Sequence, residues 1–130
     1  VTAEPLILTI DVPDDLQATR GRLRAVNLWL HLDNLTVYDA IEVELNGTPL
    51  VCVNPLRPGG YDPTPDAWLR FDLIEHLPVQ GANAIKVWMA TRNARLADEI
   101  AVEIADVELE VCYEYPDGQW RRSPGWYPRG

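Results

Sequence analysis

The sequence predicts an all-β fold, specifically an antiparallel eight-stranded β-sandwich of the jelly-roll type. Apolar and polar residues alternate along most of the 130-residue chain, and the spacing of an amphipathic helix is nearly absent. Turn residues separate the alternating segments, and no strand–helix–strand rhythm occurs. Many short, half-buried strands between turns are typical of antiparallel sandwiches and barrels, and eight strands in two sheets suit a jelly roll.

The first three strands are expected at 6–12, 23–32 and 39–45. The first ends at the breaker Pro13-Asp14-Asp15, and the third alternates apolar residues with glutamates. The second has two different faces. One face is continuously apolar and consists of Val26, Leu28, Leu30 and Leu32, and the other carries Ala25, Asn27, Trp29 and His31.

The dipeptide Asn46-Gly47 follows the third strand and predicts a tight hairpin leading into a strand at 50–53. Both central residues of such a turn need positive φ, which Asn and Gly tolerate best. Residues 54–67 contain four prolines and two glycines, which exclude regular structure. A loop of this length in a small domain is usually functional or specifically packed.

Four more strands are expected at 68–73, 84–90, 100–104 and 107–115, with one short helical turn within 74–79. The apolar phase reverses at Ala105-Asp106, which predicts a β-bulge or a short break. The expected organisation is therefore a β-sandwich domain at 1–115, followed by a Pro/Gly/Trp-rich tail at 116–130. We expect this tail to be a linker or an arm that docks on a neighbouring region.

The charge balance narrows the range of partners. The 20 acidic and 11 basic residues give a formal net charge of −9. Binding to a phosphate backbone or to an anionic membrane requires a positive surface, so neither nucleic acid nor membrane is expected as a partner. The apolar content of 47% and charged content of 24% are those of an ordinary globular domain.

Several segments together resemble galactose-binding-like β-sandwich domains. The stretch Asp39–Leu50 is similar to their hairpin that ends in Asn-Gly, and Trp68–Leu73 is similar to the strand that follows. Gly81–Val87 matches their Gly-x-Asn turn and strand, and Asp106–Tyr113 matches their closing strand. The resemblance covers about 6–115. Such domains commonly lie beside the catalytic domains of bacterial glycoside hydrolases, where many bind carbohydrate and others only pack against the enzyme. The Asn-Gly and Gly-x-Asn elements are turn chemistry rather than ligand chemistry.

The sequence gives little support for catalysis. His31 and His76 have no metal-ligand spacing, and Ser123, in the tail, is the only serine. Cys52 and Cys112 both fall within predicted strands, where they can be two free buried thiols or one disulfide. The chain is therefore not expected to be an enzyme, although it can be part of a larger glycoside hydrolase.

Acidic residues form two further candidate sites, one for acid–base catalysis and one for calcium. Neighbouring carboxylates occur at Glu42 and Glu44, and again at Glu108 and Glu110. We expect both pairs to be solvated on an outward sheet face rather than to act as an acid–base pair. No cofactor is expected, but a structural calcium ion is an alternative. Its candidate ligands are Asp11, Asp14, Asp15, Asp106 and Glu108.

Aromatic residues provide the main indication of binding. Trp29, Trp68 and Trp88 each lie opposite the apolar stripe of their strand. Sugars stack their apolar C–H faces on such rings, and His31, Arg70 and Lys86 alternate with the tryptophans as hydrogen-bonding groups. We expect one sheet face to bring these six residues together. The alternative is that the rings pack on loops, on the tail or on an adjoining domain.

A second candidate site is the proline-rich loop. Its ligand-binding candidates are Tyr61 and Asp62, with Arg57 and Asp66 nearby, and the alternative is a rigid connection. The expected function is a non-catalytic, carbohydrate-binding accessory module of a polysaccharide-acting enzyme. The alternative is a purely structural β-sandwich domain that packs against an adjoining catalytic domain or partner chain and has no ligand.

Overall fold

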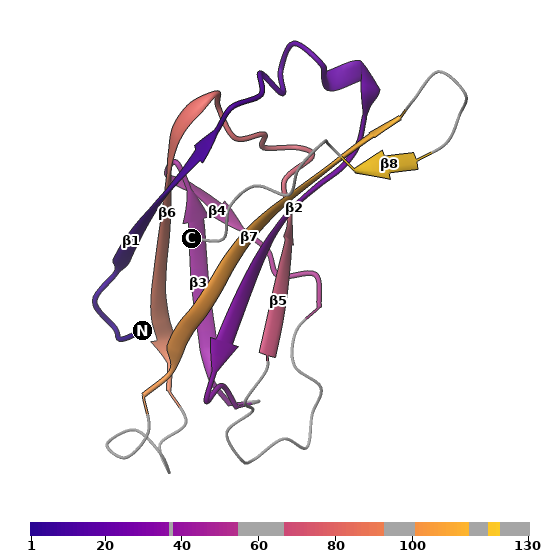
Figure 1. Ribbon diagram of the computed structural model, residues 1–130. Coiled ribbons are helices and arrows are strands. Elements are labelled where there is room, and N and C mark those ends of the chain that lie inside the picture. Colours follow the sequence, from indigo (N-terminus) through magenta and orange to yellow (C-terminus); the bar gives the residue numbers. More distant parts are fainter. Residues whose placement is uncertain (37, 55–66, 93–100, 115–119, 123–130) are drawn as a thin grey trace.

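The alternating segments form two antiparallel β-sheets in the computed structural model (Figure 1). The structure describes residues 1–36, 38–54, 67–92 and 101–114, together with the backbone of 120–122. The first sheet, called here the β1 sheet, has the order β1 (Leu6–Val12), β6 (Gly81–Thr91), β3 (Ala40–Leu45), β4 (Thr48–Leu50). The β2 sheet has the order β5 (Ala67–Asp72), β2 (Leu23–Asp33), β7 (Glu103–Glu114), β8 (Trp120–Arg122).

The core lies between the two sheets and consists of the inward side chains of each strand. In β2, the four predicted apolar residues Val26, Leu28, Leu30 and Leu32 are fully buried. Phe71 of β5 is the largest of the fully buried side chains, and Ile85 and Val87 of β6 are also fully buried. Burial of this apolar surface is the main driving force for folding, and it confirms the predicted inward faces of these strands.

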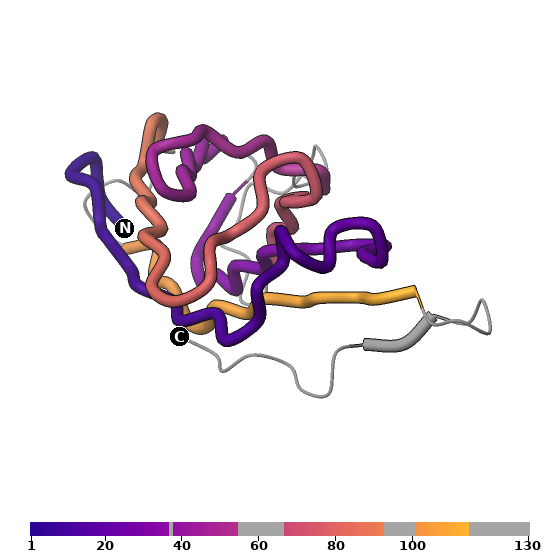
Figure 2. The backbone as a smooth tube through the Cα atoms, turned by 90° about the horizontal axis from the view of Figure 1, so that it is seen from above, coloured from indigo at the N-terminus to yellow at the C-terminus, as the bar shows by residue number. Residues whose placement is uncertain are grey.

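The chain changes sheets at most connections. It runs from β1 to β2, returns for the β3–β4 hairpin, crosses again to β5, returns to β6 and crosses once more to β7. Figure 2, which views the molecule from above, shows the indigo strand β1 at the outside next to the salmon strand β6. Most strand pairs are therefore distant in sequence, and an all-β, two-sheet architecture is confirmed.

The predicted phase reversal at Ala105 is a β-bulge within one long strand. His31 pairs with Asp106, whereas the next residue, Leu32, pairs with Ile104, so Ala105 is the extra residue. The expectation of two separate strands at 100–104 and 107–115 is therefore wrong. A bulge inserts one residue without breaking the ladder, and β7 continues through it. The eight predicted strands thus merge into seven, and β8, which was not predicted, is the eighth strand of the described residues.

The strand expected at 50–53 is also corrected. β4 ends at Leu50, and Cys52 makes only an isolated bridge to Phe71 of β5. The chain leaves the β1 sheet at this point and lies along the edge of the other sheet, where the Val53 amide donates to the Arg70 carbonyl at 2.9 Å. This crossing joins the two sheets on the side of β4 and β5.

Three other segments differ from the predictions. Residues 74–79 contain a hydrogen-bonded turn, with the His76 amide donating to the Leu73 carbonyl, and no helix. The sequence did not indicate the short 3₁₀ helix at Arg20–Arg22. The expected tail contributes β8, which pairs with the end of β7.

The Asn46-Gly47 hairpin is confirmed, because both residues have positive φ, 50° and 88°, and Leu45 pairs directly with Thr48. Asn46 also donates through Nδ2 to Oδ1 of Asn83 at 2.9 Å and accepts from the Ala84 amide at 2.8 Å. Asn83 is buried and holds its own turn by donating to the Val79 and Gly81 carbonyls. Both asparagines are therefore turn elements, as predicted.

We expect Gly47→Val to lower the free energy of unfolding by roughly 1–3 kcal/mol, because a β-branched residue is strained at positive φ. Open space surrounds the position, so a steric clash does not add to the loss. Chemical denaturation measures the change. Gly21→Val is the control, since Gly21 also lies in open space but does not have positive φ. Equal losses in the two variants would contradict the assigned turn.

The hydroxyl of Tyr113 ties β7 to the segment after β1. It donates to Oδ2 of Asp14 at 2.8 Å. Burial raises the pKa of Tyr113 above its usual range, and the hydrogen bond to Asp14 raises this pKa further. The folded state therefore favours the neutral phenol. The resulting stabilisation is complete below the unfolded pKa of about 10 and is lost as the pH rises through the folded pKa.

We therefore expect the free energy of unfolding of Tyr113→Phe to decrease less than that of wild type as the pH rises above about 10. At neutral pH the variant should be less stable by about 1–3 kcal/mol, because it lacks a hydrogen bond to a carboxylate. Denaturation midpoints between pH 7 and pH 11 test both effects. Tyr38→Phe is the control because Tyr38 is exposed. Parallel pH profiles for wild type and Tyr113→Phe would contradict the assignment.

Candidate functional site

The outward side of the β2 sheet carries a group of aromatic and polar side chains from three neighbouring strands. We call it the aromatic face and define it by Asn27, Trp29 and His31 of β2, Trp68 and Arg70 of β5, and Glu108 and Glu110 of β7. In the register of the sheet, Trp29 lies opposite Arg70 on one side and Glu108 on the other. His31 lies opposite Trp68. The structure thus brings together four of the residues predicted to bind a ligand.

The rings of this face contact one another. The imidazole of His31 stacks on Trp68, with ring centroids 4.5 Å apart and planes inclined by only 8°. Trp29 meets Trp68 edge-on, with centroids 6.4 Å apart and an angle of 78°. All three side chains are partly buried. Stacked and edge-to-face contacts are the favourable geometries for aromatic pairs, so the rings support one another in fixed orientations.

A line of hydrogen bonds holds the polar side chains beside the rings. Arg70 Nη1 donates to Oδ1 of Asn27 at 3.2 Å, and Asn27 Nδ2 donates to Oε1 of Glu110 at 3.0 Å. The indole Nε1 of Trp29 donates to the same carboxylate oxygen at 3.4 Å. Glu110 therefore anchors both Trp29 and Asn27, and Asn27 in turn orients Arg70. Sequence reasoning missed Asn27 as a site residue, although its parity with Trp29 places it on the same face.

The expectation that Glu108 and Glu110 are solvated is wrong. Glu108 is only 9% exposed, and Glu110 is half-buried and accepts the two bonds described above. The cause is tertiary, since β7 pairs with β2 here and Trp29 of β2 is directly opposite Glu108. The other pair behaves differently: Glu42 is exposed and Glu44 is partly buried on the β1 sheet.

Asn54 fixes the start of the proline-rich loop next to the aromatic face. Its Nδ2 donates to the Trp68 carbonyl at 2.9 Å, and its Oδ1 accepts from the Arg70 amide at 2.6 Å. The asparagine side chain thus takes the place of a neighbouring strand at this edge of β5. The predicted loop residues Arg57, Tyr61, Asp62 and Asp66 lie outside the described residues.

Lys86 and Trp88 do not belong to the aromatic face, so the expectation of a single face for all six residues is wrong. They lie on β6, opposite Glu44 and Glu42 respectively, on the outward side of the β1 sheet. The ammonium of Lys86 is 5.6 Å from the Trp88 ring centre, a cation–π contact. Outward residues of the two sheets of a sandwich point in opposite directions, which separates this pair from Trp29 and Trp68.

The described residues contain no group of three or more His, Cys, Asp or Glu side chains arranged to hold a metal ion. Two of the calcium candidates have structural partners instead, because Asp14 binds Tyr113 and Asp15 accepts from the Ala18 amide at 3.2 Å. Cys52 and Cys112 are free thiols and form no disulfide. No helix in the described parts of the chain is long and apolar enough to cross a membrane.

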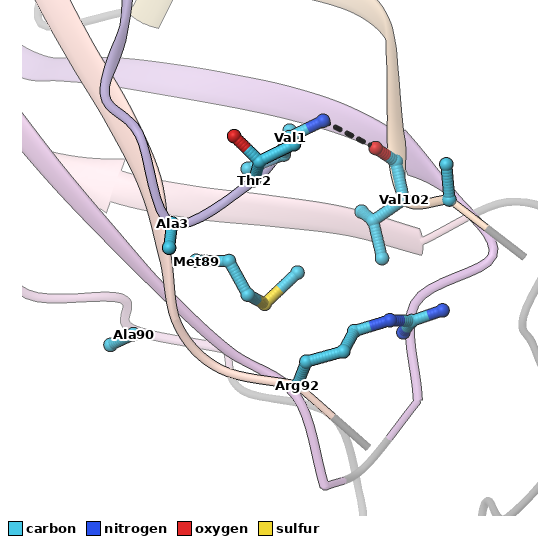
Figure 3. A pocket seen from close by; sticks show the side chains of 8 residues that line it. Val1, Thr2, Ala3, Met89, Ala90, Arg92 and Val102 are labelled. Carbon is cyan, nitrogen blue, oxygen red and sulfur yellow. Dashed lines mark hydrogen bonds between the residues drawn. The ribbon is translucent and has the colours of Figure 1, made fainter. Parts of the chain in front are cut away.

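A pocket of about 370 Å³ lies at the C-terminal end of β6, and the residues that line it include none of the predicted site residues (Figure 3). Met89 and Val102 supply an apolar wall, and the Val1 amine donates to the Val102 carbonyl at 2.6 Å. Arg92 also lines the pocket, but it donates at 2.6 Å to Asp39, whose side chain is fully buried. The polar groups shown here are therefore engaged with the fold.

Comparisons of the chain with protein-family models, curated proteins and solved structures found no match. The function is therefore inferred from the geometry of the chain itself.

We expect Glu110→Ala to release the Trp29 ring and to weaken the near-ultraviolet circular dichroism of the tryptophans. Stability should fall by about 1–3 kcal/mol, because a half-buried carboxylate and its hydrogen bonds are lost. Glu42→Ala is the matched control on an exposed outward position of the other sheet. An unchanged tryptophan signal in Glu110→Ala would show that the carboxylate does not orient the ring.

Proposed function

We propose that this chain is a non-catalytic carbohydrate-binding module, attached to or associated with a polysaccharide-acting enzyme, and that the aromatic face is its binding surface. The observation that carries the proposal is the placement of Trp29 and Trp68 side by side on an outward sheet face, within reach of Arg70, Asn27 and Glu110. The two rings offer apolar surface to the C–H faces of sugars. Arg70 and Glu110, which are both partly exposed, supply a donor and an acceptor for hydroxyls, whereas Asn27 is buried and positions them.

The way in which this face is held supports the proposal. The aromatic residues come from neighbouring strands rather than from loops, and stacking and hydrogen bonds limit their rotamers. A preorganised surface loses little conformational entropy on binding, which matters for a weakly interacting ligand such as a sugar chain. An outward sheet face with several aromatic rings also suits an extended polymer better than a small buried molecule.

We also propose that the sandwich is a galactose-binding-like, jelly-roll variant. The segments that resemble that family occupy corresponding structural roles: Asp39–Leu50 covers the β3–β4 hairpin, Trp68–Leu73 covers β5, and Gly81–Val87 begins β6. The repeated passage of the chain between sheets is a further point in favour.

The test is affinity electrophoresis of the whole chain through gels that contain neutral plant, fungal or bacterial polysaccharides. Trp68→Ala should abolish retention that wild type shows on at least one of them. Loss of one stacking ring would cost on the order of 1–3 kcal/mol, by analogy with other aromatic contacts, which is enough to erase a weak affinity. Trp88→Ala is the matched control, because it removes an indole from the opposite sheet.

The proposal predicts retention for Trp88→Ala and loss for Trp68→Ala, with both variants folded by circular dichroism. Equal effects of the two substitutions would argue against the aromatic face. Absence of retention for wild type on every polysaccharide, together with unchanged tryptophan fluorescence, would favour a purely structural domain. The exposed apolar side chains Leu6 and Ile7 on β1 are the specific observation that supports this second candidate.

A further inference from the structure

The four edge strands of the two sheets differ in how well they are protected against pairing with another chain. β4 has only three residues and includes Pro49, which has no amide hydrogen. β8 is equally short and pairs only with Cys112–Glu114, the end of β7, which carries the bulge at Ala105 farther along the same edge. The edge of β5 is occupied by Val53 and Asn54, which bond to its backbone at Trp68 and Arg70. Shortness, proline and coverage are the usual means by which proteins block sheet edges.

β1 has none of these protections within its own length, although Pro5 and Pro13 flank it, and none of the described residues pairs with its outer edge. It runs for seven residues, Leu6–Val12, with an uninterrupted register against β6 and therefore no bulge. It contains no lysine and no proline, and it is the outermost strand of the β1 sheet in the described part of the chain (Figure 1). Leu6 is 43% exposed and Ile7 is 64% exposed, on opposite sides of the strand.

An apolar groove accompanies this edge. Leu6 and Leu8 of β1 form one wall, and Ile104 and Val107 of β7 form part of the other, around a space of about 430 Å³. The groove lies where the two sheets separate, opposite the side that Cys52 closes. A strand added beside β1 would turn every second side chain toward the inside of the sandwich, over this groove.

The charged residues along β1 indicate the chemistry of a segment that can pair with it. Glu4 lies two residues before β1, Asp11 lies on its outward side, and Glu103 begins β7 at the groove, and all three are exposed. Lys86, the residue opposite Ile7, is held over the Trp88 ring. A second copy of this chain would bring a like net charge of −9 to this edge, which disfavours self-association.

We propose that β1 is a docking edge for an extended segment of a partner protein that alternates apolar residues with lysine or arginine. The apolar side chains enter the groove beside Leu6 and Leu8, and the basic ones face outward near Asp11 and Glu4. Main-chain hydrogen bonds to β1 provide affinity, and the alternation provides specificity, as in other cases of strand addition. This proposal does not depend on carbohydrate binding.

The test uses the whole chain and a synthetic, strand-length peptide of alternating valine and lysine. We expect hydrogen–deuterium exchange at the β1 amides to slow at least tenfold when the peptide is added, with little change in β3 or β7. A peptide of alternating valine and glutamate should have no such effect. A valine–lysine peptide of the same charge, with proline in place of the central valine, should also fail to slow the exchange. Proline has no amide hydrogen, so this peptide cannot form all the main-chain hydrogen bonds of a paired strand.

Ile7→Lys supplies the matched variant, since it places a like charge at an exposed outward position of the edge. It should lower the affinity for the valine–lysine peptide at least tenfold, as measured by fluorescence anisotropy. Val51→Lys should leave this affinity unchanged, because Val51 is 80% exposed but lies outside β1. Protection outside β1, equal binding of the proline-containing peptide, or equal effects of the two lysine substitutions would overturn the proposal. Concentration-dependent dimerisation that Ile7→Lys abolishes would also overturn it, in favour of a second copy.

Discussion

The register of β2 is the constraint on which the rest of this molecule depends. β2 lies between β5 and β7 and pairs with both over most of its length. Its even-numbered residues from Val26 to Leu32 enter the core, and the odd-numbered ones between them build the aromatic face. A shift by one residue would exchange these two sets and place Asn27 and His31 in the apolar core instead of leucines, away from their present partners. The cost of burying unpaired polar groups makes that shift strongly unfavourable, so the core and the candidate site are specified together.

The same alternation occurs in the β1 sheet, so the outward aromatic residues fall into two groups, one on each sheet. β6 sends Ile85 and Val87 inward, which requires Lys86 and Trp88 to face outward on the far side of the sandwich. The two groups are also held differently. Trp29 is fixed by a carboxylate and an aromatic neighbour, whereas Trp88 is accompanied by a lysine over its ring. This difference is why the proposed binding surface includes one group and excludes the other.

The two sides of the sandwich are also unlike. On one side the chain crosses between the sheets through Cys52 and Asn54, so the edge of β5 is occupied and the proline-rich loop begins beside the aromatic face. On the other side β1 and β7 leave an apolar groove and an exposed strand edge. A sugar-binding face and a protein-docking edge would therefore occupy separate parts of one small domain, and a polysaccharide could be bound without displacing a partner.

Local chemistry was sufficient to predict much of this structure. Alternation identified the inward faces of β2, β5 and β6, and the Asn46-Gly47 pair identified a turn with two positive φ angles. The phase reversal at Ala105 indicated an irregularity there, a bulge or a break. Each of these features depends on a few consecutive residues, so it can be recognised in the sequence. The partners of each strand depend instead on contacts between distant segments. Only the tertiary structure decided that Glu108 is buried opposite Trp29, that Trp88 faces away from Trp29, and that β1 is left at an edge, because strand order and sheet membership are set by how the whole core packs.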